Sequence, residues 1–397
     1  MPAPVSSLIA RMSASCDRQE WVSSSDLVAL WEVASTIPDP RGRRGTRYPL
    51  ATILTLALAA TIAGARSFAQ FAAWSADVPA RWWSRFGLGR ATPSADTFAR
   101  VLGLVDPEVV DAVLAAWVAA RVPEPAAVAL DGKAARGAVD RTGAMTHLLS
   151  IVDALSGIPL GQVDAAHAKG YEIPAFRTVL DRIPLRGVIL TADALHTQPA
   201  HAHYLHRHGA HYVFTVKANR AALLKRLQGL PWTDVPIGAS TTEKAHGRIT
   251  TRHIQVVSTS RPLGFPHASL TARIQRHVTH VRTGAKTSET AYVITSLTHD
   301  QITPERLADL VRNHWSIENK VHWVRDVAYD EDRSQIRTGT RARVMATLRN
   351  TALGLIRAAG ITTIAPTLAA MARRVERVIA LLDNEPIPNI TTRSTMR

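Results

Sequence analysis

Apolar residues recur every three to four positions through the first third of the chain, a spacing typical of helices. The longest apolar stretches begin at Leu50 and cover residues 109–122. Ser94 lies before a further helical segment, where its side chain can cap the helix. Prolines follow residue 122 and indicate a domain boundary. We therefore predict a flexible tail at residues 1–16 and an all-helical N-terminal domain at residues 17–122.

The pattern changes after these prolines, because short runs of β-branched and apolar residues now alternate with helical segments. Strands are predicted at residues 126–130, 148–152, 160–163, 188–192 and 211–216, with helices at 175–182 and 197–208. Such alternation is typical of an α/β domain. Residues 126–220 are expected to form the first part of its core. The first of these strands ends at Asp131 and the fourth at Asp193.

A third sequence pattern begins at residue 221, where β-branched residues occur at alternating positions. Residues 221–299 are therefore predicted to be an inserted β-rich subdomain. Thr303, followed by Pro304, then has the pattern of a helix start, and that helix is expected to reach about Asp326. Residues 300–360 would complete the core, and residues 361–397 would form a C-terminal helix and tail.

The charge balance narrows the choice of partners. Lysine and arginine total 47 against 32 acids, a net charge of +15, which favours a polyanion such as nucleic acid. Two stretches, 244–288 and 333–375, carry eight basic residues each and no acid. A coding bias toward arginine is the alternative explanation, but it would not remove the acids. The loop after the first predicted helix contains a compact basic patch of Arg41, Arg43, Arg44 and Arg47.

Cysteine content and apolar runs exclude several other classes. The single cysteine, Cys16, cannot form an intrachain disulfide framework or a cysteine-based zinc site. A reducing cytoplasm is consistent with this. The longest uncharged run, residues 48–65, contains three threonines and is barely long enough to cross a bilayer. We therefore expect a cytoplasmic, nucleoid-associated protein without a membrane span.

The candidate catalytic residues are carboxylates at the ends of predicted strands and on a predicted helix. Asp131 and Asp193 follow predicted strands, and the carboxyl ends of such strands are where α/β sheets bind ligands. In a helix through residues 312–326, His314, Glu318 and His322 would share one face, with Arg325 one turn further. Trp315 and Trp323 are expected to be core residues of that helix. Three carboxylates could hold two Mg²⁺ ions, the arrangement used to cleave phosphodiester bonds.

Short motifs spread over residues 25–355 resemble one known family. They include Asp39-Pro40-Arg41, Arg47-Tyr48-Pro49-Leu50, Asp131-Gly132-Lys133 with Arg136-Gly137, Leu160-Gly161-Gln162, Lys169 with Glu172-Ile173, Thr191-Ala192-Asp193-Ala194, Lys217-Ala218-Asn219, His314-Trp315, Ile317-Glu318-Asn319, His322-Trp323 and Asp326-Val327. In this order they resemble the DDE transposases of bacterial insertion sequences, in the group that contains the H-repeat-associated proteins. Tyr171 and Arg220 depart from the pattern, since Asn and Gln are usual there.

The resemblance implies an RNase H-like core with a β-rich insertion, in which Asp131, Asp193 and Glu318 bind two Mg²⁺ ions that Mn²⁺ can replace. It implies cleavage of double-stranded DNA at terminal inverted repeats and strand transfer into target DNA, by a homodimer on the DNA. The residues expected to contact DNA are Lys133, Arg136, Lys169, Lys217, Asn219, His314, His322 and Arg325, together with Arg41, Arg43, Arg44 and Arg47.

Two other functions fit parts of the sequence. A domesticated DNA-binding protein could keep the transposase fold without catalysis, although the intact acidic triad argues against it. A zinc hydrolase could use the crowded histidines at positions 201, 203, 206, 208 and 211, because neutral imidazole suits zinc whereas carboxylates suit Mg²⁺. A solvated helix face explains those histidines more simply, and zinc held tightly by the pure protein would favour the hydrolase.

Overall fold

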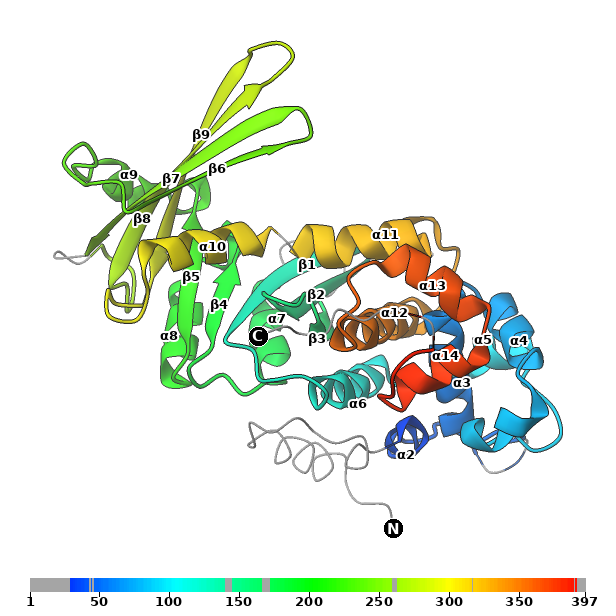
Figure 1. The fold of residues 1–397 in the computed structure, drawn as a ribbon. Coiled ribbons are helices and arrows are strands. Elements are labelled where there is room, and N and C mark those ends of the chain that lie inside the picture. Colours follow the sequence, from blue (N-terminus) through cyan, green and yellow to red (C-terminus); the bar gives the residue numbers. More distant parts are fainter. Residues whose placement is uncertain are drawn as a thin grey trace. The chain divides into compact units, whose positions relative to one another are not determined.

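The computed structural model describes residues 29–42, 44, 46–139, 145–165, 172–258, 263–315, 317–388 and 390 (Figure 1). The chain divides into two compact units. Unit 1 consists of Met1–Glu124, Gly132–Arg182 and Glu318–Arg397, and unit 2 of Pro125–Asp131 and Ile183–Ile317. The division falls within strand β1, Ala127–Val139, so Asp131 is directly followed on the same strand by the first residue of a unit 1 segment.

The N-terminal helices of unit 1 surround one fully buried helix. They are α2 (Leu30–Ser35), α3 (Leu50–Ile62), α4 (Phe68–Ala76), η2 (Ala80–Phe86), α5 (Ala95–Leu102) and α6 (Pro107–Ala119). All residues of α3 are buried, because its alanine, leucine, isoleucine and threonine side chains present no charged face. Ser94 caps α5 as predicted, since its hydroxyl accepts a hydrogen bond from the Thr97 N–H.

The C-terminal helices complete the same core. They are α12 (Arg341–Ala358), α13 (Ile364–Ala372) and α14 (Val375–Leu382), and each packs on α3. Most residues of α12 are buried. Helices from the two ends of the chain thus share one hydrophobic core in unit 1.

The rest of unit 1 brings strands and short helices next to this core. It contains β2 (Met145–Asp153), β3 (Pro159–Asp164), α7 (Glu172–Leu180), η5 (Glu318–His322), α11 (Trp323–Tyr329) and η6 (Glu331–Arg333). Strands β2 and β3 form an antiparallel hairpin. Gly157 lies in its turn with a φ of 75°, a left-handed conformation that glycine adopts without steric cost. This glycine therefore allows the tight turn that joins β2 to β3.

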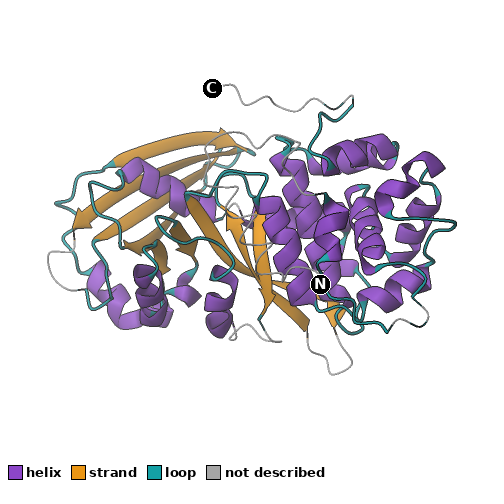
Figure 2. Cartoon of the chain, turned by 90° about the horizontal axis from the view of Figure 1, so that it is seen from below, coloured by secondary structure: helices purple, strands orange, loops and turns teal. Residues whose placement is uncertain are grey.

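Unit 2 combines parallel and antiparallel strands. Its elements are β4 (Ile189–Ala192), η3 (Ala194–His196), α8 (Pro199–Arg207), β5 (His211–Val216), η4 (Ala218–Arg220), α9 (Ala221–Gln228), β6 (Ala239–Ala245), β7 (Arg248–Ser258), β8 (Leu270–His280), β9 (Lys286–Thr295) and α10 (Pro304–His314). Strand β4 is parallel to β1 and β5, whereas β9 is antiparallel to β5. Figure 2 shows this mixture of strands (orange) and helices (purple), which agrees with the predicted α/β class.

The β-rich segment at residues 221–299 extends the sheet rather than forming a separate one. The strand order continues from β5 through β9, β8, β7 and β6. The register of β5 with β9 pairs Phe214 with Ile294, both fully buried. The antiparallel pairing of β9 with β5 therefore joins the segment directly to the core strands.

Three local predictions were wrong. Strand β1 does not end at Asp131 but continues to Val139. Its pairing with β4 stops at Leu130, but β1 has a second neighbour, β2, on its other side. The helix that begins after Thr303 ends at His314 instead of reaching Asp326. Trp315 and Trp323, expected in the core, are 70% and 57% exposed. The start of that helix was predicted correctly, since the Thr303 hydroxyl accepts the Arg306 N–H.

The described residues form no helix that could span a membrane. None of their helices has both the length and the apolar character that a bilayer crossing requires.

Candidate metal centre

Strand register brings the two candidate aspartates to neighbouring positions in unit 2. Leu130 of β1 is paired with Ala192 of β4, and Asp131 and Asp193 directly follow these partners on the two parallel strands. The Asp193 carboxylate also caps η3, accepting the Leu195 N–H at 2.9 Å. Parallel pairing therefore explains why both acids lie at the same end of the β1–β4 ladder.

Glu318 and His322 occupy the two ends of a π-helical turn, η5. This wider turn is rare and occurs frequently at functional sites. The Nδ1 atom of His322 lies 3.1 Å from Glu318 Oε2. The Glu318 side chain is 64% exposed, whereas His322 is buried. The sequence predicted His314, Glu318 and His322 on one helix face. Helix α10 ends at His314, however, so this histidine does not belong to the helical turn that carries Glu318 and His322.

Hydrogen bonding and nearby cations keep Glu318 ionised. The hydrogen bond from His322 is the largest influence and lowers the pKa of the Glu318 carboxyl below its usual value. Burial acts in the opposite direction, and the charges of Lys133 and Arg136 lower the pKa further. An ionised carboxylate is the form that binds a metal cation.

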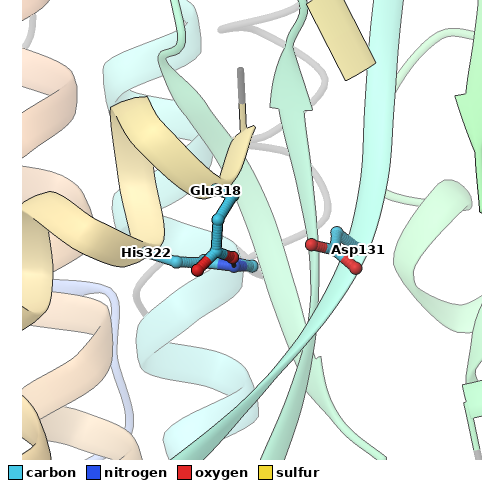
Figure 3. A group of neighbouring side chains, drawn as sticks. All are labelled: Asp131, Glu318 and His322. Carbon is cyan, nitrogen blue, oxygen red and sulfur yellow. Dashed lines mark hydrogen bonds and ion pairs between the residues drawn. The ribbon is translucent and has the colours of Figure 1, made fainter. Parts of the chain in front are cut away.

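Asp131, Glu318 and His322 form a group that could hold a metal ion. Each offers one ligand atom, and these atoms all lie within 4.8 Å of one another (Figure 3). Carboxylate oxygens suit Mg²⁺, and an imidazole beside them also suits borderline metals such as Mn²⁺. Among the described residues, Asp193 is not a member of this group, so its role as a third ligand stays a prediction.

Lys133 and Arg136, which follow Asp131 on β1, differ in whether they are free to contact a phosphate. Lys133 is buried and donates hydrogen bonds to both carboxylate oxygens of Asp326, at 2.8 and 2.7 Å. Arg136 is 78% exposed, and its Nε lies 3.9 Å from an Asp332 oxygen. Arg136 is therefore open to a phosphate, whereas Lys133 already binds a carboxylate.

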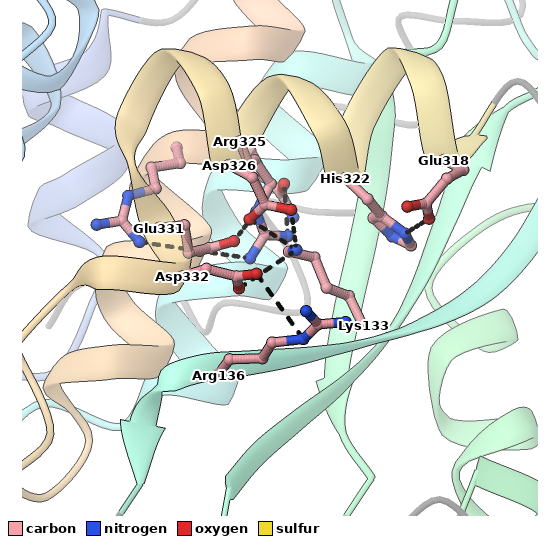
Figure 4. A network of polar contacts seen from close by, with 10 residues as sticks. Lys133, Arg136, Glu318, His322, Arg325, Asp326, Glu331 and Asp332 are labelled. Carbon is pink, nitrogen blue, oxygen red and sulfur yellow. Dashed lines mark hydrogen bonds and ion pairs between the residues drawn. The ribbon is translucent and has the colours of Figure 1, made fainter.

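Arg325 does not point to solvent as a DNA contact would require. Its side chain is fully buried and donates two hydrogen bonds to Glu331, at 2.8 and 2.7 Å (Figure 4). A third, at 3.2 Å, reaches Asn350 of α12. A phosphate contact from Arg325 would therefore require this buried network to open, and we do not retain Arg325 among the proposed DNA contacts.

The remaining predicted DNA contacts divide into paired and open side chains. Asn219 donates to the Ala194 carbonyl and so holds the turn that follows Asp193. Arg41 pairs with Asp39 at 2.7 Å. The residues Lys217, Arg44 and Arg47 are exposed. Arg43 and Lys169 lie outside the described residues.

His314 is held as a neutral imidazole. Its Nδ1 lies 3.3 Å from the Thr191 hydroxyl. Burial lowers the pKa of His314 to about 4, Asp193 acts in the opposite direction, and His196 and Lys217 lower the pKa further. We therefore expect His314 to stay uncharged above about pH 5. The predicted phosphate contact from His314 would thus lack a positive charge.

NMR titration of the His314 ring nitrogens, assigned with a His314→Asn variant, checks this expectation. Because the Asp193 carboxylate favours the protonated ring, Asp193→Asn should lower the His314 pKa still further. A pKa near the ordinary value of about 6.5 would contradict the buried, neutral state.

A buried His147–Glu172 pair packs against the backbone beside Asp131. His147 Nε2 lies 2.6 Å from Glu172 Oε1, and both residues are buried. A Cβ atom added at Gly132 would collide with Glu172 Oε1 and approach His147 Nε2 to 2.7 Å. Only glycine therefore fits between Asp131 and Lys133. Only Glu172 of this pair could have been noticed from the sequence, because it is part of a family motif.

We expect Gly132→Ala to destabilise the protein by about 1–3 kcal/mol, the usual cost of overpacking a filled interior. The added methyl group must displace two buried side chains that hold each other. Urea denaturation followed by circular dichroism measures the change. Gly89→Ala is the matched control, since nothing lies within 4 Å of the added carbon there. Equal effects at both positions would argue against the collision.

Known proteins resemble this chain over most of its length. A family model described as "Transposase DDE domain" matches residues 121–355, and one described as "DDE_Tnp_1-associated" matches residues 31–118. "Putative transposase YncI" of Escherichia coli O157:H7 is 28% identical over 83% of this chain and 87% of its own length. "H repeat-associated putative transposase YhhI" of Escherichia coli K12 is 26% identical over 83% and 91%. This chain therefore belongs to the DDE-domain transposase family.

Proposed function

We propose that this protein cleaves DNA strands at the ends of its own mobile element and transfers them into target DNA, with divalent metal ions as cofactors. The observation that carries the proposal is the approach of Asp131, Glu318 and His322, whose ligand atoms lie within 4.8 Å of one another. Family membership supports the same chemistry, because the resemblance implies Asp131, Asp193 and Glu318 as metal ligands and the family match spans all three.

Asp131 and Glu318 would hold the metal through carboxylate oxygens, with His322 as a further ligand or as the group that orients Glu318. A bound divalent ion activates an attacking hydroxyl and relieves the charge on the phosphate. Asp193, on the strand beside Asp131, is our candidate for the carboxylate that completes a site for two Mg²⁺ ions. Mn²⁺ should replace Mg²⁺, since one donor is an imidazole.

Two bond exchanges make up the reaction. In the first, water attacks the phosphorus at the element end, a bond from phosphorus to the water oxygen forms, the bond to the 3′ oxygen breaks, and this oxygen takes up the proton that the water releases. In the second, the freed 3′-hydroxyl attacks a target phosphate, and the displaced target oxygen takes up the proton. The protein must therefore bind the terminal inverted repeats and the target, and we propose that a homodimer brings two ends together.

Exposed basic side chains supply the DNA contacts in this proposal. Arg136 lies five residues after Asp131 on β1, and Lys217, Arg44 and Arg47 are also open to solvent. Contacts of this type bind phosphates without reading base sequence. Each of these contacts makes DNA binding more sensitive to salt, because every neutralised phosphate releases counterions. We therefore expect the DNA affinity to fall as the salt concentration rises.

A cleavage assay tests the proposal. The full-length protein is mixed with duplexes that carry the repeats flanking its gene, with and without Mg²⁺, and the strands are resolved on a sequencing gel. We expect nicks at the repeat ends only when Mg²⁺ or Mn²⁺ is present. DNA binding without metal-dependent cleavage would overturn the proposal and favour a non-catalytic DNA-binding protein.

A further inference from the structure

Two consecutive residues of α11, Arg325 and Asp326, are bonded to different parts of unit 1. Arg325 donates to Glu331 of η6, and Asp326 accepts from Lys133 of β1 (Figure 4). Both residues lie in the segment that directly follows the π-helical turn with Glu318 and His322. Helix α11, which follows the candidate metal ligands, is therefore bonded through charged side chains to both η6 and β1.

The Arg325 connection continues through the interior. Glu331, which is buried, accepts hydrogen bonds from Arg325 and also from Arg349 of α12 at 2.9 Å. Arg325 further contacts Asn350, whose amide donates to Gln162 of β3 at 2.9 Å. Because buried charges are costly unless they are paired, the bonds of Arg325 to Glu331 and Asn350 favour one placement of α11 relative to α12.

The Asp326 connection reaches the strand that carries Asp131. Lys133 Nζ lies 2.7 Å from Asp326 and 3.8 Å from Asp332, so one buried ammonium faces two carboxylates. Only Gly132 separates Lys133 from Asp131 on β1. The ion pair therefore links the backbone next to one candidate ligand with the helix that follows the other two.

We propose that Lys133, Arg325 and Asp326 are positioning residues that hold the metal ligands in place, and that Lys133 and Arg325 do not contact DNA. The proposal rests on the proposed function and deepens it. Lys133 and Arg325 have the charge of phosphate contacts, and the sequence suggested that role for both. Their burial and their carboxylate partners assign them to the support of the metal site instead. Groups that orient metal ligands commonly contribute 10- to 100-fold to metal affinity or activity.

Matched variants of the full-length protein separate the two roles. Lys133→Met and Asp326→Asn each remove one partner of the ion pair, and Lys133→Arg keeps the charge. Arg136→Met is the control, since Arg136 is exposed on the same strand. Three quantities are measured for each variant: Mn²⁺ binding by electron paramagnetic resonance, DNA affinity against salt concentration with Ca²⁺, and the rate of single-turnover cleavage.

We expect Lys133→Met and Asp326→Asn to weaken Mn²⁺ binding roughly 10-fold and to slow cleavage about 10- to 100-fold. DNA affinity and its salt dependence should stay unchanged, and Lys133→Arg should recover part of the metal affinity. Arg136→Met should do the opposite, lowering the salt slope by about one and leaving Mn²⁺ binding unaltered. The double variant Lys133→Met/Asp326→Asn should be no worse than either single one, because one shared interaction is lost.

Other outcomes overturn the inference. A lower salt slope for Lys133→Met, with unchanged Mn²⁺ binding, would identify Lys133 as a DNA contact. Equal loss of all three measured quantities in both variants, together with a lower melting temperature, would show a general folding defect. Failure of the proposed function looks different: the wild-type protein would bind Mn²⁺ but would not cleave, while the variants would still report on positioning.

Discussion

Replacing Asp131 by Asn or Glu318 by Gln should reduce metal-dependent DNA cleavage at least about 10³-fold. The amide keeps the size of the side chain but loses the negative charge that binds the cation. Glu318 is poised as a carboxylate, because the hydrogen bond from His322 lowers its pKa. DNA affinity should change by no more than about twofold, since phosphate binding depends on the basic residues.

Single-turnover cleavage and fluorescence anisotropy on the same duplex measure the two effects. Asp193→Asn should show the same loss if Asp193 completes the site. Asp300→Asn is the control, because Asp300 is an exposed acid in the turn between β9 and α10 of unit 2. Substantial Mg²⁺-dependent cleavage in the Asp131 or Glu318 variant would remove the residue from the proposed site. Loss of DNA binding in either would instead indicate a structural role.

Replacing Arg325 by Met should destabilise unit 1 by about 3–5 kcal/mol, the usual cost of breaking a buried ion pair. Glu331 would lose two hydrogen bonds in a fully buried position. Burial alone would raise the pKa of Glu331, but the charges of Arg325 and Arg349 outweigh it and lower this pKa to about 2. The carboxylate is thus stabilised mainly by its two guanidinium partners.

This pKa gives the effect a defined pH dependence. A carboxyl whose pKa is lower in the folded protein contributes stability above its unfolded pKa of about 4.3, and that contribution is lost as the pH falls toward about 2. The Arg325→Met variant should therefore differ most from the wild type at neutral pH. The difference should shrink progressively below about pH 4.

Urea denaturation at pH 7 and at pH 3 measures both parts of this prediction. Arg333→Met is the matched control, because Arg333 is 85% exposed and lies 3.8 Å from its partner Asp330. Its replacement should change the free energy of unfolding by less than about 0.5 kcal/mol. A comparable effect for both arginines, or an Arg325 effect independent of pH, would contradict the buried pairing with Glu331.

The basic stretches show how tertiary structure changes the meaning of a charge pattern. Residues 333–375 contain no acid, so the sequence suggested a surface for DNA. In the fold, Arg349 binds Glu331, and Arg343 binds Glu108, an acid more than 200 positions earlier in the chain. These two of the eight basic residues in the stretch therefore have acidic partners within unit 1. On β7 and β8, Arg252 and Arg276 also have acidic partners, Glu243 and Glu289, but at more exposed positions.

Sequence alone determined the features that depend on neighbouring residues or on short motifs. The caps at Ser94 and Thr303 were predicted because capping requires only one side chain and the next turn of backbone. The α/β class followed from local periodicity. Asp131, Asp193 and Glu318 could be selected because they lie in family motifs, and the family itself could be identified from them.

Only the tertiary structure decided which groups those residues meet. Local periodicity could not show that the helix stops at His314, or that a π-helical turn pairs Glu318 with His322. Nor could it show that the buried side chains of Lys133 and Arg325 are paired with Asp326 and Glu331, since these acids become their partners only after the chain has folded. The physical reason is that charge is a property of a residue, whereas pairing and burial depend on distant parts of the chain.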